Sequence, residues 1–477
     1  MHELQSLIAQ SSKINFRKVI SRPFPPLIAE LLQSPLADNK IYSDFLSSSF
    51  SYKNLIVADG EVYDDVSLVH NEHDICSSIL DFDSSFFHRK VSDAELIGNK
   101  LLKWSINISN RQNCSSFQII TEFKLMSDSF MPYLTFVPTV GEILESRIIE
   151  FLLSKVNSLD IAEEYAFQLT APRRLSNHIN EQIDFYLLAL KKGITKIDIK
   201  NHLKHYAYFG FLWGYGKAWD TNFLESRIKN AKNPQDELDL IIANIRKLNT
   251  KREHVGQLIK EDTSMQELVD LSRRYVWLRS YRSEILNQAF ANISTVLNRF
   301  YMDLGFNDSD YLYFTSNEII EGRLVKPKEI EQRRSSFCLI IIDGISHYLS
   351  GDQACKFKNV IKNKSKTDLL LKGSVTCRSQ CQISGRACIV NNISDLKSIH
   401  NNDIIISSMT TPHFVPFMKK ASGIVTDEGG ILCHAAIISR EMNIPCIVGT
   451  KTATSQVRTG DVVNMDLCTG IVTYRGI

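Results

Sequence analysis

The chain has 477 residues, which is enough for roughly two to four domains that each bury a core. Its composition, 44% hydrophobic and 23% charged, is that of an ordinary globular protein. Lys and Arg number 55 against 53 Asp and Glu, so the overall charge gives no support to nucleic acid or an anionic membrane as a partner.

The amino-terminal sequence "MHELQSLIAQSSKINFRKV" lacks the unbroken apolar core of a signal peptide. The longest apolar run, "CLIII" at residues 338–342, is far shorter than the ~20 residues of a membrane span. The ten cysteines show no disulfide-framework spacing, and the CxxxC pair Cys377 and Cys381 has no further ligand pair nearby. We therefore expect a soluble cytoplasmic protein with reduced thiols and no metal site.

Residues 1–139 carry signals of both strands and helices. The stretch "NLIVADGEVYDDVSLV" alternates apolar and polar residues around an Asp59-Gly60 turn, which predicts a β-hairpin. The stretch "FQIITEFKL" at residues 117–125 predicts a further strand. We predict a mixed α/β region over residues 1–139.

Residues 140–355 change to a helical pattern. Stretches such as "VGEILESRIIEFLLSKV" and "LDLIIANIRKL" place apolar residues three and four positions apart, with few prolines. This spacing predicts a packed helical domain over residues 140–355.

A basic segment follows at residues 356–370. It carries five lysines without a long apolar face: Lys356, Lys358, Lys362, Lys364 and Lys366. A solvated basic linker is the simplest interpretation, and we predict that it is exposed and hinge-like.

Residues 371–477 have a third texture. Short β-type segments such as "DIIISSM", "ASGIVTD" and "DVVNMD" are broken by Gly, Asp and Ser, with one helix-like stretch, "HAAIISREM". These residues predict a compact β/α domain, so the whole chain is expected to be a multidomain α+β protein.

Two stretches of the helical region have side chains suited to a small molecule. Residues 202–219, "HLKHYAYFGFLWGYGKAW", hold a dense group of aromatics that includes Trp213 and Tyr215, which could line a pocket or form a bulky core. Arg279 and Arg282 stand three residues apart on a predicted helix. They could hold a phosphate or carboxylate, although surface ion pairing is the commoner role of such arginines.

The stretch "TDEGGILCHAAIISR" at residues 426–440 carries the most specific chemical signal. Gly429 and Gly430 can form a tight turn into a helix whose first amides favour an anion. His434 would lie in the first turn of that helix, where a neutral imidazole is a competent nucleophile, although such a histidine can also be a cap or a surface group. Asp427 and Glu428 near this helix start would complement its dipole or take part in catalysis.

Residues 409–450 resemble the phosphohistidine swivelling domain of phosphoenolpyruvate-utilising enzymes, such as phosphoenolpyruvate synthase, pyruvate phosphate dikinase, rifampicin phosphotransferase and glutamine kinase. The resemblance rests on Thr411 and Pro412, on "IVTDEGG", on the Cys433-His434 pair and on "IPCIVGT". It implies that His434 is the phosphorylated residue. Other positions are expected to contact the phosphate or shape its loop: Thr426, Gly429, Gly430 and Cys433.

The first 350 residues contain no recognisable ATP-grasp domain or glycine-rich nucleotide loop, and only 43 residues follow His434. The resemblance then implies a donor site with Mg²⁺ and ATP, or phosphoenolpyruvate, on a separate ATP-grasp subunit. Residues 140–355 would be the acceptor-binding or docking domain, with Trp213, Tyr215, Arg279 and Arg282 as candidates for the acceptor. The alternative is a noncatalytic docking or regulatory protein that retains a swivelling domain.

Overall fold

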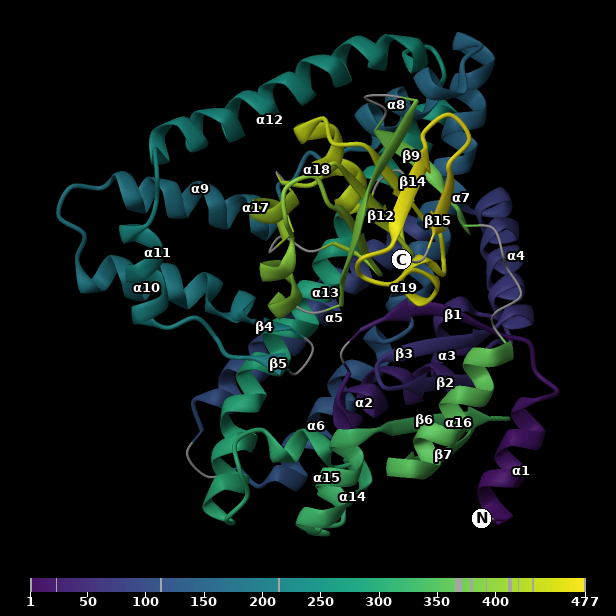
Figure 1. Ribbon diagram of the computed structural model, residues 1–477, viewed down its shortest axis with the longest axis vertical. Coiled ribbons are helices and arrows are strands. Elements are labelled where there is room, and N and C mark those ends of the chain that lie inside the picture. The colour runs from purple at the N-terminus through teal and green to yellow at the C-terminus, as the bar shows by residue number, and fades with distance from the viewer. Residues whose placement is uncertain are drawn as a thin grey trace. The chain divides into compact units, whose positions relative to one another are not determined.

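The computed structural model describes the chain except for residues 1, 23, 112–113, 213–214, 365–370, 378–380, 392, 411–413, 419, 431–432 and 476–477. The chain divides into two compact units (Figure 1). Unit 1 comprises Met1–Arg17, Arg22–Ile148 and Pro172–Asn363. Unit 2 comprises Lys18–Ser21, Ile149–Ala171 and Lys364–Ile477. The prediction of a multidomain α+β chain is confirmed.

Unit 1 contains a sheet of order β1-β3-β2-β6-β7, although residues 18–21 of β1 are assigned to unit 2. Its strands are β1 (Phe16–Ser21), β2 (Leu55–Ala58), β3 (Glu61–Asp65), β6 (Phe337–Ile342) and β7 (Ile345–Ser350). The pairs β2–β3, β2–β6 and β6–β7 are antiparallel. Every residue of β2 and β6 is buried, which fits the continuous apolar runs of these central strands.

The predicted hairpin at Asp59-Gly60 is confirmed. Asp59 and Gly60 have φ values of 48° and 83°, both in the left-handed region that a two-residue hairpin turn requires. A Cβ atom on Gly60 would lie 1.9 Å from the carbonyl oxygen of Arg22, so only glycine fits this position.

The helices of unit 1 surround this sheet and extend from it. They are α1 (His2–Ser11), α2 (Pro26–Ala37), α3 (Asn39–Leu46), α4 (Val66–Phe82), α5 (Ser84–Ser109), α6 (Ser116–Ser127), the first part of α7 (Tyr133–Val156), α9 (Asn177–Leu190), α10 (Lys196–Tyr206), α11 (Thr221–Lys229), α12 (Pro234–Gly256), α13 (Thr263–Asp303), α14 (Ser316–Ile320), α15 (Pro327–Ser335) and α16 (Gly351–Lys364). Figure 1 shows the long helices α5 and α13 side by side. None of the described helices is long and apolar enough to cross a membrane.

The predicted boundary at residue 139 is wrong. Strands β2 and β6 pair directly, although nearly the whole helical region separates them in sequence. Residues of the amino-terminal region and of the helical middle therefore share one sheet and one unit. Local patterns carry no information on which distant strands pair, because the pairing is made only in the folded chain.

The predicted strand at residues 117–125 is also wrong, because these residues form α6. The side chain of Ser115 caps this helix by accepting a hydrogen bond from the Gln118 amide at 3.2 Å. Ile119, Ile120 and Phe123 are buried, a spacing that fits one helical face. The apolar residues of such a short run fit both the period of a helix and the period of a strand. Packing in the folded chain decides which of the two forms.

The lysine-rich segment is not a linker over residues 356–364. These residues belong to α16, which lies on the sheet of unit 1 (Figure 1), with Phe357 and Ile361 0% and 2% exposed. Lys362 pairs with Glu61 at 2.6 Å, and Lys358 pairs with Asp59. The lysines form the polar face of an amphipathic helix, while residues 365–370 of the predicted linker lie outside the described residues.

Unit 2 is built on an eight-stranded sheet of order β8-β15-β14-β10-β11-β12-β13-β9. Its strands are β8 (Leu371–Lys372), β9 (Ser374–Cys377), β10 (Gln382–Val390), β11 (Ile404–Ser407), β12 (Gly423–Thr426), β13 (Cys446–Val448), β14 (Val462–Asp466) and β15 (Ile471–Arg475). The four neighbours β10 to β13 are parallel. Its helices include α8 (Leu159–Thr170), α17 (Val415–Met418), α18 (His434–Met442) and α19 (Ala453–Gln456).

Both faces of the parallel strands are buried. Ile405 and Ile424 belong to the hydrophobic core on one face, whereas Ile404, Ile406 and Val425 belong to the core on the other. Unit 2 thus includes the predicted domain at residues 371–477, but it also takes in residues 149–171 and 18–21, which the sequence pattern assigned elsewhere.

Replacement of Phe357 tests whether α16 is a core element. The Phe357→Ala change should lower the free energy of unfolding by about 3–5 kcal/mol, because it removes a fully buried ring. Urea denaturation of the full chain measures this value. The exposed Lys356 on the same helix provides the control, and Lys356→Ala should change stability by less than about 0.5 kcal/mol. Equal midpoints for wild type and Phe357→Ala would restore the linker interpretation.

Candidate functional site

The parallel strands of unit 2 bring three loops to one edge of the sheet. Strands β11, β12 and β13 are parallel neighbours, so the segments that follow Ser407, Thr426 and Val448 start side by side. The Asp427 amide donates to the Ser407 carbonyl at 3.0 Å, and the Thr450 amide donates to the Thr426 carbonyl at 3.0 Å. The segment after β12 is therefore bonded on both sides.

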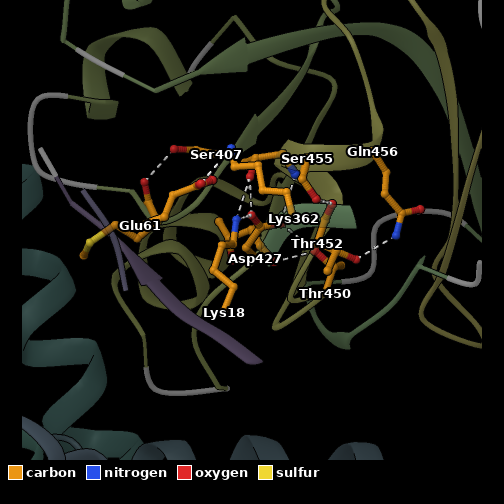
Figure 2. Close-up of polar contacts among 12 residues, drawn as sticks. Lys18, Glu61, Lys362, Ser407, Asp427, Thr450, Thr452, Ser455 and Gln456 are labelled. Carbon is orange, nitrogen blue, oxygen red and sulfur yellow. Dashed lines mark hydrogen bonds and ion pairs between the residues drawn. The ribbon is translucent and has the colours of Figure 1, made fainter. Parts of the chain in front are cut away.

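Asp427 is the buried polar centre of this edge. It is 3% exposed and accepts a hydrogen bond from the Thr454 amide at 3.0 Å, together with one from the Thr454 hydroxyl. Asp427 also forms an ion pair with Lys18, whose Nζ lies 3.2 Å from Asp427 Oδ2 (Figure 2). Lys18 lies in the short segment 18–21, which is part of unit 2 as Asp427 is. The carboxylate thus joins three segments of the chain.

The Asp427 carboxylate accepts a hydrogen bond from the amide of Thr454, the second residue of α19. Its expected role near α18, to complement the helix dipole or to take part in catalysis, stays a prediction. Neither Lys18 nor Thr454 was predicted, because both are remote from residues 426–440 in sequence. The only local signal was a carboxylate directly after a buried parallel strand, where loops from neighbouring strands converge.

The glycine turn after Asp427 fits closely against its surroundings. Gly429 has a φ of 109°, and a Cβ atom there would lie 2.6 Å from the Cys433 sulfur. Gly449 in the neighbouring loop has a φ of 78°, and its Cβ would lie 2.9 Å from the Gly429 carbonyl oxygen. Both positions therefore need glycine for backbone conformation and for space.

The remaining turn residues hold the turn together. Thr426 is fully buried, and its hydroxyl donates to the Glu428 carbonyl at 2.7 Å. The Gly430 carbonyl accepts from the Cys433 amide at 3.0 Å. These bonds give Thr426 and Gly430 a role in the shape of the turn.

The turn leads into α18, with Cys433 as its N-cap and His434 as its first residue. The Cys433 sulfur accepts from the Ala436 amide at 3.4 Å, which satisfies one of the free amides at the helix start. Ala435 and Ala436 are 2% and 0% exposed, so they anchor the helix. The backbone of His434 therefore stands at the positive end of a nine-residue helix, whereas its side chain is outside the described part of the chain.

Arg440 fixes the other end of α18. Its Nε donates to the Thr376 carbonyl at 2.7 Å, and its guanidinium lies 4.8 Å from the centre of the Phe167 ring of α8. Burial lowers the pKa of Arg440, and the nearby Glu163 carboxylate opposes this effect. The helix that carries His434 is thus held at its cap, along its buried face and near its last turn.

The predicted acceptor residues fall into two groups. Trp213 lies outside the described residues, and Tyr215 belongs to the short strand β5 (Tyr215–Gly216), without a described side chain. Arg279 and Arg282 stand one turn apart on α13, and Arg282 Nη1 donates to the Leu134 carbonyl at 2.8 Å.

A cavity of about 510 Å³ opens elsewhere in unit 1. Its lining is mainly polar and basic: Ser47, Phe86, His88, Arg89, Lys90, Ser92, Asp93 and Arg274. None of the predicted acceptor residues lines it. Arg274 donates to His88 Nδ1 at 2.7 Å. Burial lowers the pKa values of His88 and Lys90, while the Asp270 carboxylate opposes this effect at His88 and the Asp93 carboxylate opposes it at Lys90. Among the described residues, no group of three or more His, Cys, Asp or Glu side chains could hold a metal ion.

Asp427 can be tested with a double-mutant cycle. Asp427→Asn keeps the shape but leaves the mostly buried Lys18 without its counter-ion, so unfolding free energy should fall by about 3–5 kcal/mol in urea denaturation. Lys18→Met removes the cation of the pair. The fall in unfolding free energy of the double variant should be smaller than the sum of the two single falls by about 1 kcal/mol or more. Strict additivity would show that the two charges do not interact.

Comparison with known proteins identifies the type of domain. Residues 399–470 match the family model described as PEP-utilising enzyme, mobile domain. A probable phosphoenolpyruvate synthase from Methanothermobacter thermautotrophicus is 53% identical over 93 residues, 20% of this chain and 14% of that protein. The phosphoenolpyruvate synthase from Pyrococcus furiosus is 48% identical over 94 residues, 20% of this chain and 11% of that protein.

A longer match extends beyond the mobile domain. The probable phosphoenolpyruvate synthase from Archaeoglobus fulgidus is 35% identical over 162 residues, 34% of this chain and 21% of that protein. An NMR solution structure of Enzyme I is similar with a TM-score of only 0.19 and 17% identity, over 64% of this chain and 82% of that chain. The chain therefore contains a mobile domain of PEP-utilising enzymes, and it spans about a fifth or less of the length of these relatives.

Proposed function

We propose that this chain is a component of a phosphotransferase, in which His434 carries a phosphoryl group from a donor site to a small-molecule acceptor. The observation that carries the proposal is the position of His434. It is the first residue of α18, directly after the Cys433 cap and the glycine turn, within the matched mobile domain. A helix start of this kind favours a negatively charged phosphoryl group next to the imidazole.

Two transfers make up the proposed reaction. In the first, an imidazole nitrogen of His434 attacks the donor phosphorus, so that a nitrogen–phosphorus bond forms and the bond to the leaving oxygen breaks. In the second, a nucleophilic atom of the acceptor attacks the same phosphorus and the nitrogen–phosphorus bond breaks. The proton that the acceptor loses replaces the one that the imidazole gave up in the first transfer. The imidazole returns to its starting state.

We propose that the donor site, with Mg²⁺ and ATP or with phosphoenolpyruvate, lies on a separate ATP-grasp subunit. The relatives are several times longer than the segments they share with this chain, which supports a donor site outside these 477 residues. We place the acceptor in unit 1, with Trp213, Tyr215, Arg279 and Arg282 as candidate contacts.

A noncatalytic docking protein is the competing function. Its support is that the described part of unit 1 offers no nucleotide-binding loop recognisable from sequence. The retained histidine at the start of α18 favours the carrier function, because a domain kept only for docking has no need of a nucleophile there.

Phosphorylation of His434 tests the proposal. With an ATP-grasp subunit, Mg²⁺ and ATP labelled at the β and γ phosphates, the chain should acquire an acid-labile and base-stable label, as expected for phosphorus bonded to an imidazole nitrogen. His434→Ala and His434→Asn should each abolish the label, because neither side chain offers a nucleophilic nitrogen. The label is measured by gel autoradiography after acid and base treatment.

Cys433→Ala serves as the matched control, since it alters the cap of α18 but keeps the imidazole. It should retain most of the label. A label that persists in His434→Ala, or that proves stable to acid, would contradict the carrier function and favour the docking function.

A further inference from the structure

The cavity of about 510 Å³ in unit 1 has no role in the proposed function. Its lining comes from three parts of the chain that are distant in sequence: Ser47 at the C-cap of α3, residues between 86 and 93 on α5, and Arg274 on α13. Helices α5 and α13 lie side by side in Figure 1. A cavity of this volume is large enough for a small molecule.

Arg274 reaches from α13 to α5. Its Nη1 donates to His88 Nδ1 at 2.7 Å, and its Nη2 donates to the Ser92 hydroxyl at 3.3 Å. His88 and Ser92 are four residues apart, so they lie on one face of α5. Among the described residues, Arg274 forms no ion pair with a carboxylate. The guanidinium is therefore held in place by groups that do not neutralise its charge.

The bond to Arg274 also defines the state of His88. Arginine offers only donors, so Nδ1 accepts and the proton of the neutral ring is on Nε2. Burial lowers the pKa of His88, and the Arg274 charge lowers it further, while the exposed carboxylates of α13 at Glu267 and Asp270 oppose both effects. The ring is therefore neutral at pH 7. No described residue accepts from Nε2, which leaves its N–H as a donor in the lining.

Lys90 supplies a second cation to the lining. Its Nζ lies 4.4 Å from the centre of the Phe45 ring and 5.0 Å from the centre of the Phe86 ring. The faces of aromatic rings attract an ammonium group, but they do not neutralise its charge. Among the described residues, Lys90 forms no ion pair with a carboxylate, and Asp93 acts on it only from a greater distance.

The other charged residues of the lining do not compensate these two cations. Arg89 is already paired, because its Nη2 lies 2.8 Å from Asp83 Oδ2 and its Nη1 donates to the Ser85 hydroxyl at 2.6 Å. Asp93 is exposed, and it makes no ion pair with a described residue. An exposed charge acts weakly because water and salt screen it. The lining thus presents two cations against one exposed carboxylate.

We propose that this cavity binds a small molecule through an oxyanion, a phosphate or carboxylate group, which accepts from Arg274, Lys90 and the His88 Nε2–H. Arg274 uses only two of its five N–H groups within the described chain, and a guanidinium binds either oxyanion with paired, charge-assisted hydrogen bonds. Ser47 and Asp93 on the same lining are acceptors for hydroxyl or amino groups in the rest of the molecule.

This site goes beyond the carrier function. All of its residues belong to unit 1, and binding of an oxyanion there requires neither a phosphoryl donor nor His434. It can therefore be measured on the full chain without a partner.

The test is thermal unfolding of the full chain in inorganic phosphate, malonate or chloride at matched ionic strength. Phosphate or malonate should raise the melting temperature of the wild type by about 2 °C or more above chloride, because a ligand that binds the folded state stabilises it. Arg274→Gln and Lys90→Met should each lose most of this rise, since each removes one of the two cations. The anion with the larger effect identifies the preferred group, and either result supports the site.

Matched controls remove cations of the same helices outside the cavity. Lys100→Met on α5 and Arg299→Gln on α13 replace exposed residues and should keep the full rise. General effects of phosphate and malonate on protein hydration act on all variants alike, so the comparison with these controls isolates the cavity. Lys90→Met decides the test if Arg274→Gln does not fold, because it removes no side-chain hydrogen bond among the described residues.

Equal rises in the wild type, the cavity variants and the controls would overturn the site, and so would the absence of a rise above chloride in the wild type. His434→Ala separates the cavity from the start of α18, where the proposed function also places an anion, and it should keep the rise. Loss of the rise in His434→Ala with retention in Lys90→Met would assign the anion to α18 and overturn the cavity site. The label on His434 tests the carrier function independently of these melting temperatures.

Discussion

The candidate site depends on the contacts that the buried Asp427 carboxylate makes. It binds Lys18 and the start of α19 while its own backbone is bonded to the loops after β11 and β13. A charge so deeply buried is tolerated only when it is paired and hydrogen-bonded. The segment after β12 therefore has little freedom, and the glycine turn that follows starts from a fixed point.

The consequence of that fixed start is the geometry of α18. Gly429 brings the turn against the Cys433 sulfur, and the sulfur caps the helix whose first residue is His434. Two buried alanines and Arg440 hold the helix to the sheet. A paired buried charge contributes less to net stability than an apolar pair would, so its value here lies in the position that it imposes on the turn.

Unit 1 shows a comparable link between a backbone constraint and chemistry. Pro138 leaves the Leu134 carbonyl without its helical donor, and Arg282 donates a hydrogen bond to this carbonyl instead. The guanidinium is only partly buried, but its Nε atom is buried without a hydrogen-bond partner among the described residues. The sheet contributes as well, because the Asp59-Gly60 hairpin holds the backbone of Arg22.

The sequence by itself determined the features that depend on neighbours along the chain. These were the Asp59-Gly60 hairpin, the long helices of the middle region, the β/α texture after residue 371 and the mobile-domain motif around His434. Turn chemistry, helical periodicity and motif spacing are local, and they are therefore visible in sequence.

Only the tertiary structure decided the features that depend on distant partners. It paired β2 with β6 and so joined two predicted domains, and it made residues 117–125 a helix. It showed that most of the lysine-rich segment belongs to the amphipathic helix α16, whose apolar residues pack against the sheet of unit 1. It also brought Lys18 to Asp427, because charges far apart in sequence meet only when the chain between them has folded.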